Sequence, residues 1–335
     1  MIDFIKSIIP KFDGNLNACH LHCTYAESIS YRLYKTVEKK GAFLSLNLKT
    51  KTKTLRISGS FRKWYFGSSS LANFDANSFH KALQHLSKML SLPYSIICKS
   101  MVSQCEMGLN VIIRIPCEKI IPKIIQYGHL KRYEYAEETV GFNGSNKKLK
   151  IYHKCNEILA KQSNKLSAST KRVFAILQEK GNYFLRIEFT LFDKQSFVQH
   201  DLGYINTLGD IDLHYNALFD FWTKQVNKIV MSNIIIFDEA MTPREYQIGL
   251  CIATNGFNDF VHECLKRCKS KTDAGLRTAR SKAYKEILEV SNKYSSNQEY
   301  NKNSLRVDIA KNLIRISSND KTLHLPVLIK NLWGA

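Results

Sequence analysis

The sequence has no long run of apolar residues. No run reaches the roughly 18 residues that a membrane-spanning helix needs. The segment from Met1 to Pro10 contains Asp3, and its apolar stretch is too short for a signal peptide. We therefore expect no membrane partner and a location in the cytoplasm, where the chain is made.

Acidic residues are also scarce. The chain has 29 Asp and Glu residues against 49 Lys and Arg residues, which gives a formal net charge of +20. Folding does not require this excess, and a basic surface attracts polyanions. Nucleic acid is the simplest such partner, because the alternative, an acidic membrane surface, lacks an apolar segment to support it.

A complete zinc-binding pattern is missing as well. The nine cysteines are scattered and odd in number, which predicts reduced thiols. The run Cys19-His20-Leu21-His22-Cys23 sets two histidines around one apolar residue, as in the metal site of one class of DNA-nicking enzymes. It could also be half a zinc site, but no second Cys/His pair follows at zinc-finger spacing. A short strand or turn with incidental histidines is therefore the favoured interpretation of His20 and His22.

Hydrophobic residues make up 44% of the chain, enough for a real core. Period-two alternation and an Asn143-Gly144 turn predict strands over residues 2–9, 41–60 (a hairpin), 104–116, 134–142, 147–154 and 182–192. Apolar spacing predicts helices over residues 77–92, capped by Asn77 or Ser78, and over 119–129 and 156–166. This pattern favours an α+β fold, with helices packed on one face of an antiparallel sheet and an open catalytic face.

The character of the chain changes to helical after Asp210. Helical segments are expected over residues 214–231, 245–255 and 259–269, with Pro243 at a helix start. Asp273 is expected to cap a basic helix, 274–290, that carries Arg277 and Arg280. We predict a catalytic domain over residues 1–235 and a helical, basic C-terminal region over 236–335. The latter is either a second DNA-contacting or partner-binding unit or a solvated basic face.

Three predicted strands place a reactive polar side chain on the face opposite their apolar residues. These side chains are Glu106, Tyr152 and Glu188. Lys150 and Lys154 share the face of Tyr152, which suits a tyrosine that must lose its proton and meet a phosphate. The plain alternative is a surface strand with an ordinary tyrosine and two glutamates in structural ion pairs.

A basic and aromatic segment, residues 60–67, contains Arg62 and Lys63. Aromatic rings beside cations can stack on bases and pair with phosphates. Such rings are more often part of the core, so this segment only suggests a DNA contact.

The ordered motifs resemble a known family. Tyr152 to Glu157 fits the pattern Tyr-x-Lys-x-x-Glu, and it lies between Cys105-Glu106-Met107-Gly108-Leu109-Asn110 and Leu185-Arg186-Ile187-Glu188. Their order and spacing, over about residues 1 to 215, resemble the gene II-type replication initiators of filamentous phages and the related initiators of rolling-circle plasmids. The resemblance implies an endonuclease that nicks double-stranded replicative DNA at an origin, stays on the 5′ end through a phosphotyrosine and later rejoins the strand.

The resemblance implies roles for individual residues. Tyr152 matches the phage nucleophile, whereas the position of the plasmid tyrosine is Phe142, which has no hydroxyl. Lys154 would contact the phosphate or activate the tyrosine, and Lys150 and Lys154 would both favour its phenolate.

Carboxylates are implied as metal ligands. Glu106 and Glu188 are the first candidates and Glu157 the third, and their oxygen atoms would select Mg²⁺ or Mn²⁺. The DNA-contacting residues would include Arg62, Lys63, Lys150, Arg277 and Arg280, and a host helicase and polymerase are the further expected partners. Two alternatives stay open: a non-catalytic DNA-binding replication or regulatory protein, and a nickase that uses His20 and His22.

Overall fold

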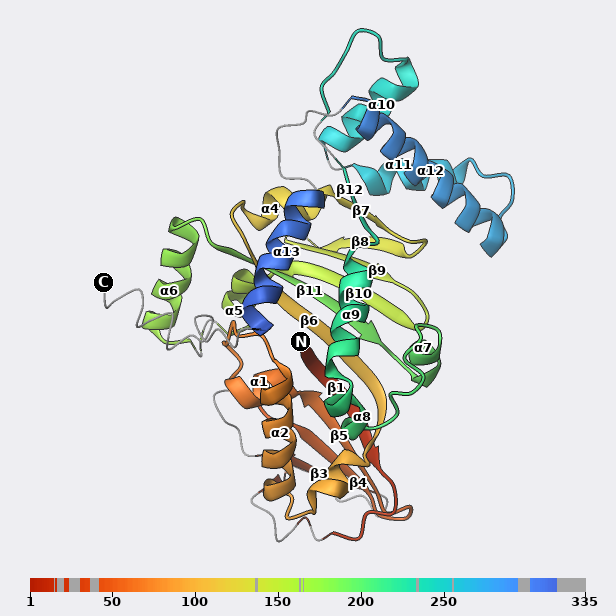
Figure 1. Cartoon of the computed structure of the whole chain (residues 1–335). Coiled ribbons are helices and arrows are strands. Elements are labelled where there is room, and N and C mark those ends of the chain that lie inside the picture. Colours follow the sequence, from red (N-terminus) through yellow and green to blue (C-terminus); the bar gives the residue numbers. More distant parts are fainter. Residues whose placement is uncertain are drawn as a thin grey trace.

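The strand β6 (Met101–Ile113) runs through the centre of the main sheet, between β1 (Ile2–Ile9) and β11 (Tyr183–Leu191) (Figure 1). The computed structural model describes residues 1–14, 16, 21–23, 31–36, 42–135, 138–162, 164, 166–232, 235–254, 256–294 and 302–317. The sheet has ten strands in the order β2-β3-β4-β5-β1-β6-β11-β10-β9-β8, and every neighbouring pair is antiparallel. The fold is thus α+β, as predicted.

The remaining strands of this sheet are β2 (Leu21–Cys23), β3 (Tyr31–Thr36), β4 (Ser45–Lys49), β5 (Thr54–Ser60), β8 (Lys131–Tyr135), β9 (Thr139–Asn143) and β10 (Lys147–His153). A second, small sheet pairs β7 (Ile124–Tyr127) with β12 (Ile229–Met231). The helices before β11 are α1 (Phe61–Phe66), α2 (Ala76–Met89), α3 (Tyr94–Cys98), α4 (Cys117–Ile120), η2 (Ile121–Lys123), α5 (Lys154–Gln162) and α6 (Ala168–Glu179). Those after it are α7 (Lys194–Val198), α8 (Leu208–Leu213), α9 (Tyr215–Val226), α10 (Pro243–Ala253), α11 (Phe257–Lys266), α12 (Asp273–Lys293) and α13 (Lys302–Ser317).

One face of the sheet is apolar and carries the main core. Leu109 of β6 and Ile187 of β11 lie opposite each other in this core, and both are fully buried. The indole Nε1 of Trp222 in α9 donates a 3.3 Å hydrogen bond to the carbonyl oxygen of Ile187. Leu305 of α13 joins the same core, and Figure 1 shows α9 and α13 in front of the central strands. These two helices therefore cover the apolar face.

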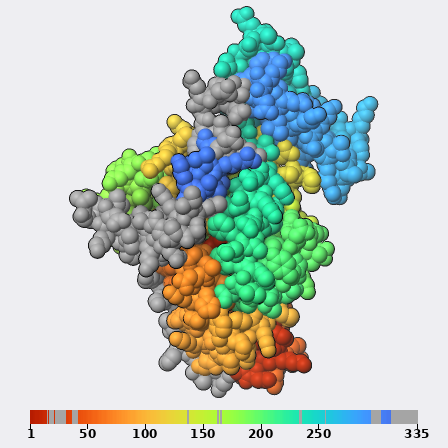
Figure 2. Space-filling model, viewed as in Figure 1, coloured from red at the N-terminus to blue at the C-terminus, as the bar shows by residue number. Residues whose placement is uncertain are grey.

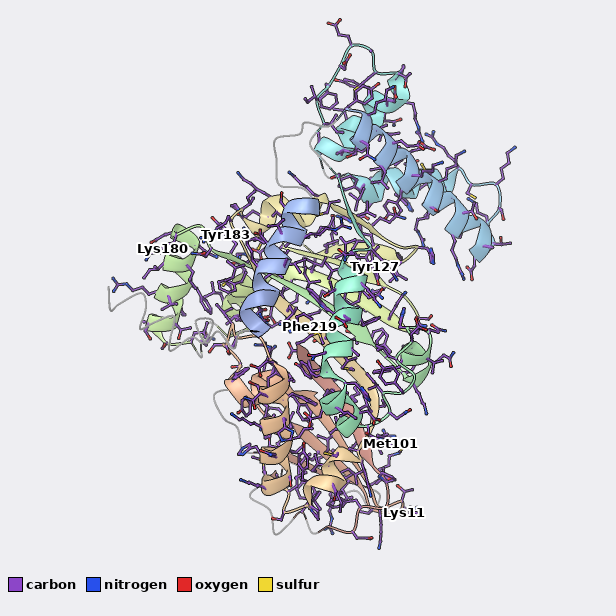
Figure 3. The ribbon with its side chains drawn as sticks, in the orientation of Figure 1. Lys11, Met101, Tyr127, Lys180, Tyr183 and Phe219 are labelled. Carbon is purple, nitrogen blue, oxygen red and sulfur yellow. The ribbon has the colours of Figure 1, made fainter. Side chains whose placement is uncertain are left out.

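The opposite face is polar in its middle and partly covered at one end. Arg186 and Glu188 of β11 alternate with the apolar residues and therefore lie on this polar face. Near the start of β11, Phe184 packs with Phe174 of α6 and with α5 in a small apolar cluster. Figure 3 labels Tyr183, the first residue of β11, close to α6. The predicted open face is thus open only beyond α5 and α6.

Near the centre of the sheet, the side chain of Asn73 makes the hydrogen bonds to β6 that a neighbouring strand would otherwise make. Ile2 lies opposite Met107, so Asn110 lies past the start of β1 and has no strand partner on that edge. The Nδ2 of Asn73 donates a 3.0 Å hydrogen bond to the Asn110 carbonyl oxygen, and its Oδ1 accepts a 2.8 Å bond from the Asn110 amide. Asn73 therefore satisfies both backbone groups and holds its loop beside the polar face.

Most predicted strands are confirmed, but the predicted strand 134–142 falls on two strands, β8 and β9, and the end of the predicted helix 214–231 forms β12. One predicted helix is wrong. Residues 119–129 were expected to form a single helix, whereas α4 ends at Ile120 and is followed by the short η2 and by β7. Pro122 explains the break, because proline lacks an amide proton and restricts the residue before it. The apolar residues after it, beginning with Ile124, pair with β12 instead.

Two predicted caps are displaced by one to three residues. Asp75, rather than Asn77 or Ser78, caps α2, and its carboxylate accepts a hydrogen bond from the Ser78 amide. Thr272, rather than Asp273, caps α12. Several polar residues precede each helix, and each can serve as a cap, so the local sequence leaves the choice open.

The C-terminal helices divide into two groups. Helices α10, α11 and α12 pack around a small core of their own, to which Ile125 of β7 also contributes. They extend beyond the sheet in Figures 1 and 2, whereas α13 returns to β6 and the main core. The division at residue 235 stays a prediction, and α13 packs with the sheet rather than with α10–α12. Within the described residues, no helix has the length and apolar character to cross a membrane.

Candidate active site

A polar cavity of about 280 Å³ opens on the polar face of the sheet. It lies where β1, β5, β6, β10 and β11 meet α1 and α5. Its lining residues are mostly charged: Asp3, Phe4, Ser60, Lys63, Glu106, Lys148, Lys150, Tyr152, Glu157, Lys161, Glu188 and Thr190. Predicted site residues from four separate parts of the sequence thus meet at one place.

Tyr152 lies at the wall of this cavity. Only 4% of its surface is exposed, but its hydroxyl donates a 2.7 Å hydrogen bond to Oε1 of Glu188. The Nζ of Lys154 lies 3.5 Å from the same hydroxyl, and the Nζ of Lys150 lies 4.3 Å from the centre of the ring. The predicted convergence of the tyrosine with Glu188 and both lysines is therefore present.

Three carboxylates form an acidic group beside the tyrosine. Asp3, Glu106 and Glu188 each offer one oxygen atom, and these atoms lie within 4.8 Å of one another. A bulge in β1 helps to aim Asp3 at the polar face, because three residue steps from Ile2 to Ile5 match two steps on β6. Sequence reasoning missed Asp3 as a ligand, although a carboxylate within an otherwise apolar strand was a signal.

The acidic group fits a divalent cation of the Mg²⁺ or Mn²⁺ type. Carboxylate oxygens are the ligands that such ions prefer. Of the three, Glu106 has no ion pair with any described lysine or arginine, and it accepts only a 3.3 Å hydrogen bond from Thr190. Burial and the charge of Glu188 raise the pKa of Glu106 to about 8, as expected for an acid that lacks a counter-charge.

Arg186 holds the other two acids in place. Its fully buried guanidinium lies 2.5 Å from Oδ2 of Asp3 and 2.9 Å from Oε1 of Glu188. Gly108 leaves room for it, because a Cβ there would lie 2.6 Å from an Arg186 nitrogen and 2.8 Å from Cγ of Glu188. The ion pair between Glu188 and Arg186, the plain alternative from sequence, is thus present together with the hydrogen bond to Tyr152.

Arg62 does not lie where a DNA-contacting side chain would have to lie. It is fully buried, its Nε is 3.3 Å from Oδ2 of Asp3, and it donates a 2.9 Å hydrogen bond to the carbonyl oxygen of Ser70. This burial contradicts the predicted direct contact and gives Arg62 a role in holding Asp3. The neighbouring Lys63 and the predicted Lys150 do line the cavity.

Glu157 lies apart from the acidic group. The helix α5 begins at Lys154, two residues before its predicted start at residue 156, so Glu157 falls in its first turn. Its two oxygen atoms each lie 2.7 Å from a lysine, Lys154 on one side and Lys161 on the other. This pairing argues against the predicted metal ligand and indicates that Glu157 holds Lys154.

Burial dominates the ionisation of the tyrosine. The pKa of Tyr152 is raised well above its usual range, first by burial and then by the charge of Glu188. We expected the lysines to favour the phenolate, but in this state the phenol keeps its proton. Burial and the charge of Arg62 lower the pKa of Lys154 to about 8. The site therefore contains a protonated phenol, a carboxylate that accepts its hydrogen bond and a lysine that readily gives up a proton.

The remaining predicted residues lie elsewhere. Arg277 and the partly exposed Arg280 are on α12, within the α10–α12 unit rather than at the cavity. His20 is outside the described residues, as is the side chain of His22. The structure therefore brings together Tyr152, Lys154, Glu106, Glu188, Lys63 and Lys150, with Asp3 and Arg186 added.

No curated protein and no solved structure matches the chain. A family model does: it describes the N-terminal part of the replication-associated gene II protein of phages, and it matches residues 1–210. This match includes every strand of the cavity, together with α1 and α5. The chain therefore belongs to this family and is a rolling-circle replication initiator of the gene II type.

Proposed function

We propose that the protein cuts one strand of replicative DNA at its origin with Tyr152 and remains attached to the new 5′ end. The observation that carries this proposal is the 2.7 Å hydrogen bond from the Tyr152 hydroxyl to Glu188, beside two further acids and within reach of Lys154. A protein that only binds DNA does not need a nucleophile, a proton acceptor and a cation at one cavity.

The residues divide the reaction among them. The phenolic oxygen of Tyr152 attacks the phosphorus atom while its proton passes to Glu188. The bond from phosphorus to the 3′ oxygen breaks, and Lys154, with its pKa lowered to about 8, gives that oxygen a proton. The products are a 5′ phosphotyrosine ester and a free 3′ hydroxyl. Because the ester preserves the bond energy, the same site can rejoin the ends.

The three acids, Glu188 included, would also bind a metal ion. A Mg²⁺ or Mn²⁺ ion bound by Asp3, Glu106 and Glu188 would neutralise charge on the phosphoryl oxygens. Arg186 and Arg62 keep Asp3 oriented toward the cavity, and Ser60 donates a further hydrogen bond to it. This fixed arrangement lowers the cost of reorganisation when the phosphate arrives.

The lysines at the cavity would hold the DNA backbone. Lys63, Lys148, Lys150 and Lys161 surround the opening and come from three different elements. Arg277 and Arg280 on α12 would provide a second contact outside the catalytic domain, which we place at residues 1–235. Phosphate contacts release counterions, so binding should weaken steeply as salt rises. The free 3′ hydroxyl would prime a host polymerase, with a host helicase separating the strands.

The experiment uses supercoiled origin DNA, Mg²⁺ and denaturing gels. Wild-type protein should give a protein–DNA adduct that resists detergent, and Tyr152→Phe should bind DNA equally well without forming it. Tyr135→Phe is the matched control, because Tyr135 is 79% exposed on β8. An adduct that persists in Tyr152→Phe would refute the assignment, and DNA binding with no adduct in any variant would favour the non-catalytic alternative.

A further inference from the structure

A second cavity, of about 560 Å³, lies on the other side of the sheet from Tyr152. Residues of the segment 199–204, which follows α7, form one wall, and α9 with the two residues that follow it forms the other. The ring centre of Phe221 lies 6.3 Å from that of Phe189, a residue of the apolar face. We call this cavity the α9 cleft. The proposed nicking reaction uses none of its residues.

The α9 cleft is rich in hydrogen-bond donors. The Oε1 of Gln225 accepts a 2.7 Å hydrogen bond from the hydroxyl of Tyr127, which Figure 3 labels beside α9. The Oε1 of Gln199 likewise accepts a hydrogen bond from Nδ2 of Asn146. Each glutamine oxygen thus already accepts one hydrogen bond, and the NH₂ group of each side chain is still available as a donor toward the cleft.

His200 adds an unused nitrogen atom. Its Nε2 is buried and has no hydrogen-bond partner among the described residues, although the residue lines the cleft. Burial, followed by the charges of Lys147 and Lys228, lowers the pKa of this imidazole. A bound water or a group on a ligand would satisfy this nitrogen atom.

Lysines give the cleft a positive side. Lys224 and Lys228 are four residues apart and lie on the same side of α9 and its extension. Neither forms an ion pair with a described acid, and both are exposed. Asp201 and Asp220 also line the cleft, but they too are exposed and have no ion pair with either lysine. The arrangement suits a ligand that carries both a phosphate and hydrogen-bond acceptors.

An exposed aromatic ring completes the cleft. Tyr204 lines it with 47% of its surface exposed, and its ring is held edge-on against His214 at 5.0 Å. Exposed rings of this kind provide stacking surfaces for bases. The cleft volume also lies in the range of small-molecule sites, about 300 to 1,000 Å³.

We propose that the α9 cleft binds a nucleotide, with the phosphate at Lys224 and Lys228 and the base against Tyr204. The glutamine NH₂ groups and His200 would meet the acceptors of the base or sugar. The same chemistry is offered by a free nucleotide and by a nucleotide within a DNA strand. This site shares no residue with the cavity at Tyr152, so its binding can be tested separately from the proposed nicking reaction.

The test measures binding to full-length protein by calorimetry in the presence of EDTA, which prevents metal-bridged binding at the acidic group. The probes are adenosine monophosphate, inorganic phosphate and a short oligothymidylate. Lys224→Ala/Lys228→Ala should weaken nucleotide binding by about tenfold or more, since each charged hydrogen bond contributes strongly. The matched control is Lys171→Ala/Lys180→Ala, which removes the same charge from exposed positions on and just after α6; Figure 3 labels Lys180.

Two further comparisons decide the identity of the ligand. Tyr204→Ala should weaken binding of adenosine monophosphate and leave phosphate binding unchanged, because only the nucleotide has a base. If the Lys224→Ala/Lys228→Ala variant lost affinity only for the oligothymidylate, the site would be assigned to a DNA strand. If it lost affinity only for adenosine monophosphate, the site would be assigned to a free nucleotide. If each probe bound wild type, the Lys224→Ala/Lys228→Ala variant and the control with the same affinity, the proposal would be overturned.

Discussion

The hydroxyl of Tyr152 donates a hydrogen bond to Glu188 across the β10–β11 pair, at 2.7 Å. Lys150 is the residue directly opposite Glu188, so Tyr152 reaches Glu188 along the diagonal of the ladder. Arg186, opposite Tyr152, pairs with the same oxygen, Oε1 of Glu188, at 2.9 Å. The strand register therefore brings a nucleophile to its proton acceptor before any substrate is bound.

The first prediction concerns this carboxylate. Glu188→Gln keeps the shape of the side chain and an oxygen that can accept from Arg186, but it removes the proton acceptor. Adduct formation in a single turnover should slow by about a hundredfold or more, the usual effect of losing a general base. DNA affinity should stay near that of wild type. Glu239→Gln, on an exposed loop, is the control, and a wild-type rate in Glu188→Gln would exclude this role.

The second prediction concerns the pH dependence of metal binding. The pKa of Glu106 is raised to about 8 without an ion, so this carboxyl is mostly protonated near pH 7 and mostly ionised near pH 9. A divalent ion needs the ionised form, and its affinity should therefore rise by roughly tenfold over this interval. Mn²⁺ binding followed by electron paramagnetic resonance would measure the rise.

The matched pair for this measurement is Glu106→Gln and Glu118→Gln. The first should bind Mn²⁺ more weakly and lose the pH dependence, whereas the second, an exposed residue of α4, should behave like wild type. If Glu106→Gln retained the full pH dependence, the titrating ligand would have to be another residue.

The third prediction concerns stability and the pair of Glu157 with Lys154. Although burial opposes it, the lysine charges lower the pKa of Glu157 to about 2, below its ordinary value. A lowered pKa in the folded state stabilises the protein above the unfolded pKa, and this contribution disappears as the pH falls toward 2. Glu157→Gln should therefore cost on the order of 2 to 3 kcal/mol near neutral pH.

Urea unfolding near pH 6 and near pH 3 would test whether the stabilisation by Glu157 decreases on acidification. The difference in the free energy of unfolding between wild type and Glu157→Gln should be smaller at the lower pH. The control, Glu179→Gln on the exposed side of α6, should differ little from wild type at either pH. A difference that grows on acidification would mean that Glu157 is not stabilised by its lysines.

The sequence predicts the strands of the site and the direction of their side chains. Alternation is a local property, so Glu106, Tyr152 and Glu188 could be assigned to one face of β6, β10 and β11 without knowing the fold. Their approach to one another was predicted only by the family resemblance, because the strand order depends on pairing between distant segments. This order places β11 between β6 and β10.

Residues that depend on long-range contacts were placed wrongly or missed. Arg62 resembles a surface cation in sequence, but it is buried against Asp3, which lies 59 residues earlier. Asp3 itself reaches the site through a bulge whose position is set by pairing with β6. Glu157 was predicted as the third metal ligand, but its two oxygen atoms pair with Lys154 and Lys161 instead. This pairing depends on the exact start of α5 at Lys154, which the local sequence does not fix.

The last prediction follows from the close approach of Gly108 to Arg186. In Gly108→Ala, the added Cβ would lie 2.6 Å from Nη2 of Arg186, a distance that requires the guanidinium to move. Since this group is buried and paired with both Asp3 and Glu188, it has no free direction in which to move. The variant should lose about 1 to 3 kcal/mol of stability, as overpacked cores do, and it should lose nicking activity even where it remains folded.

Gly256→Ala is the matched control for this substitution. Its Cβ would lie 3.4 Å from the nearest atom, an ordinary contact, and Gly256 has a negative φ that alanine adopts easily. Thermal unfolding and adduct formation should thus be close to wild type. Full activity and stability in Gly108→Ala would show that Arg186 can shift without disturbing the acids, and Arg186 would then not be the residue that positions Glu188 for Tyr152.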